Sequence, residues 1–142
     1  MAGIKIKAAD SWFSKCVREA ANWTCQKCGT QHQRKSRGLE CSHYHGRGKW
    51  SVRFDPDNCL ALCTACHFLV GGNPELHTEL FRSLRGEGLM SILREKVNDL
   101  SLGRQAKREE KQISKHYREL LKVLESRRDA GEMGVFEIEG YL

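Results

Sequence analysis

The sequence has 142 residues, of which 39% are hydrophobic and 30% charged, so its length suits one domain with a modest core. No apolar run approaches the roughly 20 residues of a transmembrane helix, and the N-terminus lacks a signal-peptide pattern, so we expect a cytoplasmic protein without membrane contact. The net charge of +6 comes from two basic blocks, residues 1–70 and 104–128, which suits contact with a nucleic-acid backbone.

The first half of the chain predicts one helix and two strands. A helix is expected over residues 10–22, with Asp10 as its cap. Apolar residues recur along it at helical spacing and form one stripe: Trp12, Phe13, Cys16, Val17, Ala20 and Ala21. A polar, basic loop follows, and residues 39–45 and 50–54 then predict two short strands joined by a glycine-rich connection.

The second half predicts helices. A short helix is expected before residue 70, and Pro74 suits the first turn of another, which ends at Gly86. Further helices are predicted over residues 89–98 and 104–128. The last helix carries an apolar seam at heptad spacing: Ile113, Tyr117, Leu120 and Leu124. We interpret this seam as a dimer interface, and the alternative is that the helix folds back onto the protomer's own core.

The seven cysteines are a poor disulfide framework, because their number is odd and the expected compartment is reducing. Four of them form two Cys-x-x-Cys pairs: Cys25 with Cys28, and Cys63 with Cys66. Each pair offers two thiolates from one tight turn, and zinc prefers tetrahedral thiolate ligation. We therefore predict one structural zinc ion, the alternative being buried reduced cysteines. Cys16 and Cys59 are assigned to the core, and the role of Cys41 stays open.

Three candidate catalytic residues lie in the order His43, Asn58, His67, the first two between the cysteine pairs and the last directly after Cys66. Histidine suits a general base because its unperturbed pKa is about 6.5. Asn58 would hold the loop and orient the imidazole. His67 would ligate a catalytic Mg²⁺ or Mn²⁺, with Glu40 or Ser42 as the second ligand. Structural histidines and a helix-capping asparagine are the alternatives.

This His–Asn–His order around paired cysteines resembles the zinc-stapled HNH (His-Me finger) nucleases, similar in logic to endonuclease VII. The chain also resembles the phage NinG/Rap recombination proteins from about residue 10 to residue 128. The matching residues include Trp12, Cys25, Cys28, Gly29, Thr30, His43, Tyr44, Arg53, Phe54, Asn58, Cys63, Cys66, Tyr117 and Arg118. The family typically has asparagine where this chain has His67. The resemblance implies an α+β fold, with a small ββα-metal core, an N-terminal helix and a C-terminal helical arm.

The resemblance further implies an endonuclease that cleaves Holliday junctions and other branched DNA in phage recombination, acting as a homodimer in the host cytoplasm. We divide the chain into a nuclease core (1–73), a helical region for dimerisation and DNA binding (74–128) and an acidic tail (129–142), which could be a strand or disordered. The residues predicted to contact DNA are Arg34, Lys35, Arg37, His45, Arg47, Lys49 and Arg53. Two other functions stay open: an HNH endonuclease of homing, restriction or packaging type on duplex DNA, and a non-enzymatic zinc DNA-binding module.

Overall fold

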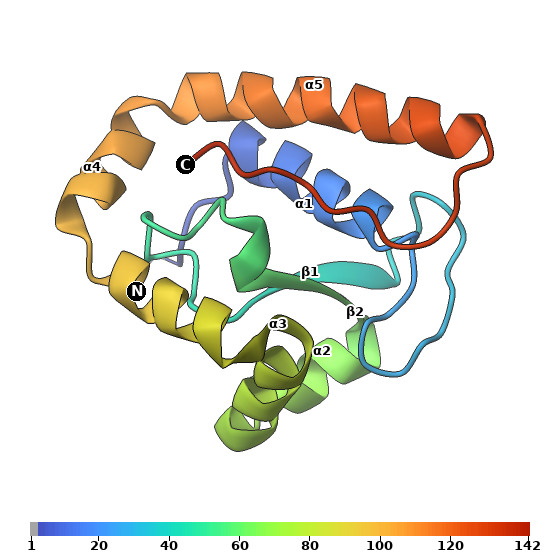
Figure 1. Ribbon diagram of the computed structural model, residues 1–142, viewed down its shortest axis with the longest axis horizontal. Coiled ribbons are helices and arrows are strands. Elements are labelled where there is room, and N and C mark those ends of the chain that lie inside the picture. Colours follow the sequence, from blue (N-terminus) through green and yellow to red (C-terminus); the bar gives the residue numbers. More distant parts are fainter. Residues whose placement is uncertain (1–2) are drawn as a thin grey trace.

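The computed structural model describes residues 3–142 and shows a small mixed α+β protein (Figure 1). In chain order its elements are α1 (Ala8–Ala20), β1 (Leu39–His43), the 3-10 turn η1 (Pro56–Asn58), β2 (Cys59–Cys63), α2 (Thr64–Gly71), α3 (Pro74–Val97), α4 (Leu100–Arg108) and α5 (Glu110–Asp129). Within residues 3–142, no helix combines the length and the apolar character needed to cross a membrane.

The sheet has two antiparallel strands, with Leu39 opposite Cys63 and His43 opposite Cys59. The strand predicted over residues 39–45 is confirmed at Leu39–His43. The prediction of a strand over residues 50–54 is wrong, because those residues form turns. The true partner is an apolar run that is buried at four of its five positions. A run buried on both faces lacks the alternation by which a half-buried strand is recognised in a sequence.

Helices cover both faces of the sheet. Figure 1 shows α1 and α5 on one side and α2 and α3 on the other, with α4 turning the corner between α3 and α5. Phe13 of α1 lies at the centre, with its ring 6.0 Å from the ring of Phe54 and 4.9 Å from that of Tyr117. One cluster of buried residues includes Phe13, Tyr117 and Phe136. The three segments proposed from the sequence therefore share a single core.

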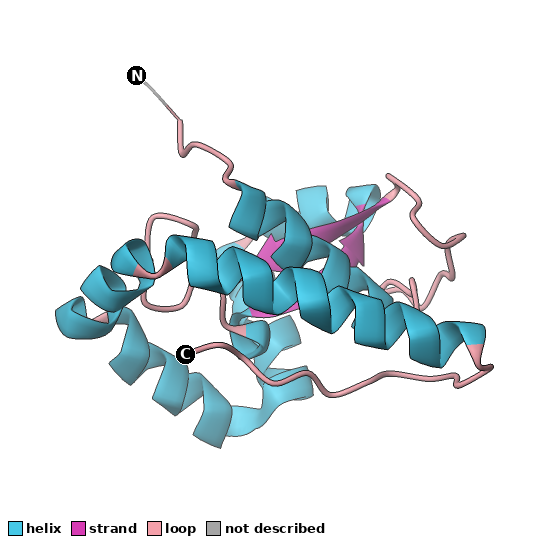
Figure 2. Ribbon diagram, turned by 90° about the horizontal axis from the view of Figure 1, so that it is seen from above, coloured by secondary structure: helices cyan, strands magenta, loops and turns pink. Residues whose placement is uncertain are grey.

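The apolar seam of α5 is part of this core, so its assignment as a dimer interface is wrong. Ile113, Tyr117 and Leu124 are at most 1% exposed. Figure 2 shows α5 running across α1, and two side-chain hydrogen bonds link it to the interior. The Tyr117 hydroxyl donates to the Phe54 carbonyl (2.5 Å), and the Cys16 thiol donates to the Tyr117 carbonyl (3.1 Å). The helix folds back and completes the protomer.

Helix boundaries follow local backbone signals. α1 begins before its predicted cap, with Lys7 at the N-cap position, and the Asp10 carboxylate accepts the Lys7 backbone N–H (2.8 Å). Gly86 interrupts α3 with φ 82°, as predicted from the glycine. The single helix predicted over residues 104–128 is two helices, which meet at Glu109 (φ −100°, ψ 20°).

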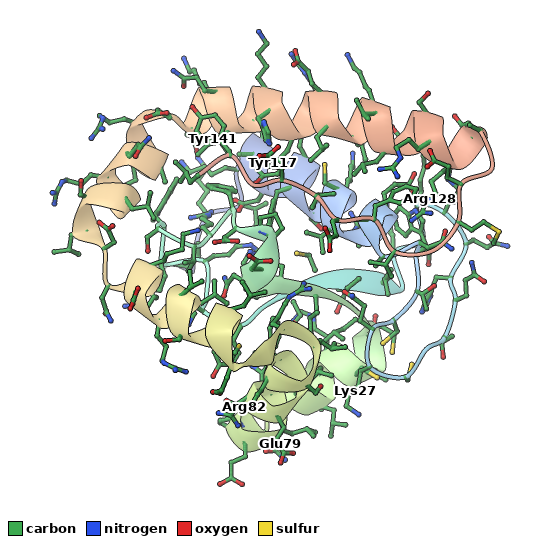
Figure 3. The ribbon with its side chains drawn as sticks, in the orientation of Figure 1. Lys27, Glu79, Arg82, Tyr117, Arg128 and Tyr141 are labelled. Carbon is green, nitrogen blue, oxygen red and sulfur yellow. The ribbon has the colours of Figure 1, made fainter. Side chains whose placement is uncertain are left out.

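After Asp129, which ends α5, the acidic C-terminal segment is coil and contains no strand. It returns alongside α5 toward α4 (Figures 1 and 2). The Phe136 backbone N–H donates to the Ala20 carbonyl (2.8 Å), and the Arg128 guanidinium lies 3.6 Å from the Phe136 ring centroid. Near the end of the chain, the Tyr141 backbone N–H donates to the Tyr117 hydroxyl (3.2 Å), and Figure 3 shows these two tyrosines side by side below α5.

A buried ion pair ties α1 to the turns that precede η1. Arg53 Nη2 lies 2.6 Å from Asp10 Oδ2 and Arg53 Nε lies 2.9 Å from Asp10 Oδ1, and both side chains are 2% exposed. Burial raises the pKa of Asp10, but the hydrogen bonds and charge of Arg53 outweigh it, so the net pKa is lowered. Arg53 is inaccessible to a ligand, and its prediction as a DNA contact is wrong.

Removing the carboxylate charge should destabilise the protein strongly. We expect Asp10→Asn to lower the free energy of unfolding by about 3–5 kcal/mol, because Arg53 would stay buried without its counter-ion. Denaturant titration measures this change, and Glu79→Gln, at an exposed position of α3, is the matched control. A loss below about 1 kcal/mol, the size of an exposed ion pair, would contradict the assignment.

The same pair predicts acid sensitivity. Because the folded pKa of Asp10 lies below its unfolded value, the stabilisation is complete above that unfolded value, about 3.9, and is lost as the pH falls through the folded pKa. The wild-type protein should therefore lose more stability than Asp10→Asn between about pH 5 and pH 2.

Candidate metal centre and active site

Four cysteine sulfurs converge where the loop after α1 meets the junction of β2 and α2. The Sγ atoms of Cys25, Cys28, Cys63 and Cys66 all lie within 4.8 Å of one another, and Cys28 Sγ is 3.9 Å from Cys63 Sγ. Two sulfurs bound to one tetrahedral zinc stand about 3.8 Å apart. The structure thus brings together the four predicted ligands, and they could hold a metal ion such as zinc.

Hydrogen bonds explain how the two cysteine pairs meet. Gln26, inside the first pair, donates its backbone N–H to the Ala61 carbonyl (2.8 Å) and accepts the Ala61 N–H on its side-chain oxygen (2.9 Å). These two hydrogen bonds fix the first cysteine pair against β2, and β2 leads directly into the second cysteine pair. Within the second pair, the Cys66 N–H lies 3.5 Å from Cys63 Sγ, a contact that caps the start of α2.

The four thiols are electrostatically unequal. Hydrogen bonds from Thr30 lower the pKa of Cys28 to about 6, whereas burial and the neighbouring thiols raise the pKa of Cys66 to about 12. A bound dication would hold all four as thiolates, since metal ligation displaces thiol protons.

Glu40 and His67 form a second feature, on the side of the sheet that faces α2. Glu40 Oε1 lies 2.9 Å from His67 Nδ1, and the two side chains are 41% and 37% exposed. Neighbouring ligands of an octahedral Mg²⁺ stand about 3.0 Å apart, and this ion retains several waters. His67 lies in the first turns of α2, directly after Cys66. The structure therefore brings these two predicted ligands together beside the four-cysteine cluster.

His43 ends β1 and is half-buried, with its ring centroid 6.1 Å from that of Phe13. Its Nε2 lies 3.0 Å from the Arg53 carbonyl oxygen. Because a carbonyl only accepts, Nε2 must donate, which leaves the lone pair on Nδ1. Burial, followed by the charge of Arg47, lowers the pKa of His43 to about 4, so the imidazole is neutral at pH 7. The hydrogen bond expected from Asn58 is supplied by Arg53.

Asn58 is completely buried and holds both ends of the loop that follows β1. Its side-chain oxygen accepts the His45 backbone N–H (2.9 Å). Its amide nitrogen donates to the carbonyls of His45 (2.9 Å) and Val52 (3.1 Å). The predicted loop-holding role of Asn58 matches these contacts, and the same loop leads to the Arg53 carbonyl that orients His43.

The predicted residues form two groups. Side chains alternate along a strand, so Glu40 and His43 lie on opposite faces of β1, about 10 Å apart along its length. One group contains Glu40 and His67, and the other contains His43 with Asn58 behind it. A reaction using both groups needs a substrate that reaches from one to the other around the end of the strand.

His77 of α3 was not identified from the sequence. The Tyr44 ring centroid lies 5.2 Å from that of His77 and 4.8 Å from that of His45. Burial lowers the pKa of His77, with further contributions from the charges of His67 and His45, so these three histidines share one region. Among the residues described, the Nε2 atoms of His45 and His77 are buried without a hydrogen-bond partner. A lone histidine in a helix carries no motif, so only the fold reveals it.

The predicted DNA contacts differ in accessibility. Four are exposed in loops: Arg34, Lys35, Arg37 and Lys49. Two of these already have acidic partners, since Arg34 pairs with Glu19 (3.0 Å) and Lys35 lies 4.0 Å from Glu125. His45 and Arg47 are half-buried. A larger cationic surface covers the outer side of α4 and α5: Arg104, Lys107, Arg108, Lys111, Lys115, Arg118 and Lys122.

In comparisons with known proteins, no family model matches the sequence, and no curated protein or solved structure matches it either. The case for a function therefore rests on the residues and their geometry.

Proposed function

We propose that the protein is a metal-dependent DNA endonuclease of the HNH type, selective for branched DNA such as Holliday junctions. One observation carries this proposal: Glu40 and His67 are in contact, and His67 directly follows a cluster of four cysteines. A structural zinc at that cluster would fix the first turn of α2. A carboxylate–imidazole pair held this rigidly suits a catalytic Mg²⁺ or Mn²⁺.

Each residue of the two groups has a role in phosphodiester hydrolysis. When bound, a divalent cation supplies Lewis acidity at the phosphate and leaving oxygen. Glu40 and His67 would hold it in place. His43 would accept a proton from the attacking water on Nδ1, and the approaching phosphate, being anionic, would raise its lowered pKa toward neutrality. Asn58 would keep the loop, and hence the Arg53 carbonyl behind His43, in position.

The cationic surfaces support DNA as the substrate. Lys49 projects from the loop held by Asn58, and Arg37 precedes β1, so exposed positive charge lies on both approaches to the strand. The outer side of α4 and α5 offers a further row of cations, suited to a second duplex arm. Contacts of this kind recognise backbone and shape and not base sequence.

A branched substrate implies two coordinated cuts, and two active sites imply a homodimer. Because the seam of α5 is buried, a dimer would have to use another surface. Paired cleavage of a junction is consequently a stricter test of the proposal than nicking.

The deciding experiment compares a four-way junction with a linear duplex of the same sequence. We expect cleavage of the junction at least tenfold faster than of the duplex, only when Mg²⁺ or Mn²⁺ is added. The divalent ion should be omitted and not chelated in the control, so that structural zinc stays in place. The variant Glu40→Gln should lose cleavage but keep DNA binding, with Glu79→Gln as the matched control.

Each other outcome is informative. Equal rates on both substrates would favour the alternative of an HNH endonuclease on duplex DNA. DNA binding without cleavage under any divalent ion would favour the non-enzymatic zinc module and overturn the enzymatic proposal.

A further inference from the structure

A second group of possible metal ligands lies on one face of the sheet, apart from the four-cysteine cluster. One ligand atom each from Cys41, His43 and Cys59 lies within 4.8 Å of the other two. The strand register explains the convergence: His43 is opposite Cys59 and Cys41 is opposite Ala61, so all three ligands point to the same face. Cys41 is 6% exposed and Cys59 is completely buried.

We propose that Cys41, His43 and Cys59 form a second site for a thiophilic cation, with zinc as its ion. Two thiolates and one neutral imidazole would balance the charge of Zn²⁺. The assembled site would therefore carry no net charge, which is the condition under which a buried ion is tolerated. Binding breaks the two S–H bonds, forms two Zn–S bonds and one Zn–N bond, and releases two protons to solvent.

This site accounts for cysteines that the proposed nuclease chemistry leaves unused. Four of the seven cysteines form the first cluster and two belong to the second. The remaining one, Cys16, lies in α1 and donates its thiol to the Tyr117 carbonyl (3.1 Å), so it is already occupied. Three protein ligands leave zinc one open position, whereas four thiolates close the first site. The second ion should accordingly bind more weakly and exchange faster than the first.

Zinc bound at this second site would affect the cleavage reaction. This effect is the one part of the inference that rests on the proposed function. An imidazole that ligates zinc cannot also accept a proton from water. The ion would therefore withdraw His43 from catalysis, so that excess zinc would inhibit cleavage. Metal binding itself is measured without any reference to activity.

The experiment counts ions in the full-length protein. After equilibration with a micromolar free-zinc buffer, we expect two zinc ions per chain by elemental analysis, falling to one after a chelator of moderate affinity. Cys41→Ser and Cys59→Ser should each bind one ion under both conditions. Cys16→Ser, which also removes one buried thiol, should still bind two.

Cobalt provides a readout that needs no variant. Cobalt added to the protein that retains only its first zinc should give thiolate charge-transfer absorption of about half the intensity of a four-thiolate site, since the second site has two thiolates. The cobalt absorption tests whether the second site binds a metal ion even if the serine variants fail to fold. One ion per chain in the wild-type protein, or a second ion retained by both Cys41→Ser and Cys59→Ser, would overturn the proposal.

Discussion

Removing the metal from the four-cysteine cluster should unfold the protein or abolish its cooperative thermal transition. Structural zinc sites in small domains contribute on the order of 10 kcal/mol, which is comparable to the whole net stability of a typical domain. The cluster joins the loop after α1 to the start of α2, so its loss would release both from β2. The measurement is a thermal melt by circular dichroism with and without a strong chelator, alongside the zinc content.

One variant separates metal ligation from packing. Cys28 is exposed, so Cys28→Ser removes very little buried surface and yet deletes one ligand. We expect Cys28→Ser to lose tightly bound zinc and to melt at least about 10 °C lower than the wild type, a shift that several kcal/mol would produce. Cys16→Ser is the matched control and should keep its zinc. An unchanged melting temperature in metal-free protein would refute a structural role for the cluster.

Replacing His43 should reduce cleavage by roughly 10²–10⁴-fold, the usual span for the loss of a general base. We expect His43→Ala to keep its tightly bound zinc and to bind the four-way junction as the wild type does, because neither property depends on the imidazole proton. Single-turnover cleavage with saturating Mg²⁺ measures the chemical step. Zinc content and melting temperature verify that the variant is folded.

The histidine controls locate the base. His116, on α5, lies outside both groups, and His116→Ala should cleave at the wild-type rate. Near wild-type cleavage by His43→Ala would exclude His43 as the base. If His77→Ala then loses the rate instead, the base lies on the side of the sheet that carries Glu40 and His67, where the imidazoles of His45 and His77 have nitrogens without a hydrogen-bond partner within residues 3–142.

Much of the local structure could be predicted because it depends on neighbours in sequence. The glycine at position 86 interrupts α3, since a positive φ costs glycine little. The spacing of the two Cys-x-x-Cys pairs indicated one cluster, because a tight turn directs both of its sulfurs to one side. The position of Asn58 predicts a residue that holds the loop, and its side chain binds both ends of that loop.

The periodicity of the helices and the grouping of the four cysteines could be predicted from the sequence, because both depend on local spacing. Which surfaces meet depends on long-range packing, which local spacing does not encode. The heptad pattern of α5 revealed an apolar seam, but only packing against α1 shows that the seam is internal, because an apolar stripe is covered equally well by another helix or another chain. Basic character alone predicts Arg53 as a DNA contact, whereas the fold buries it against Asp10, 43 residues away. The placement of His77 and of the Cys41–His43–Cys59 group depends likewise on long-range strand and helix packing, and no local sequence pattern encodes such distances.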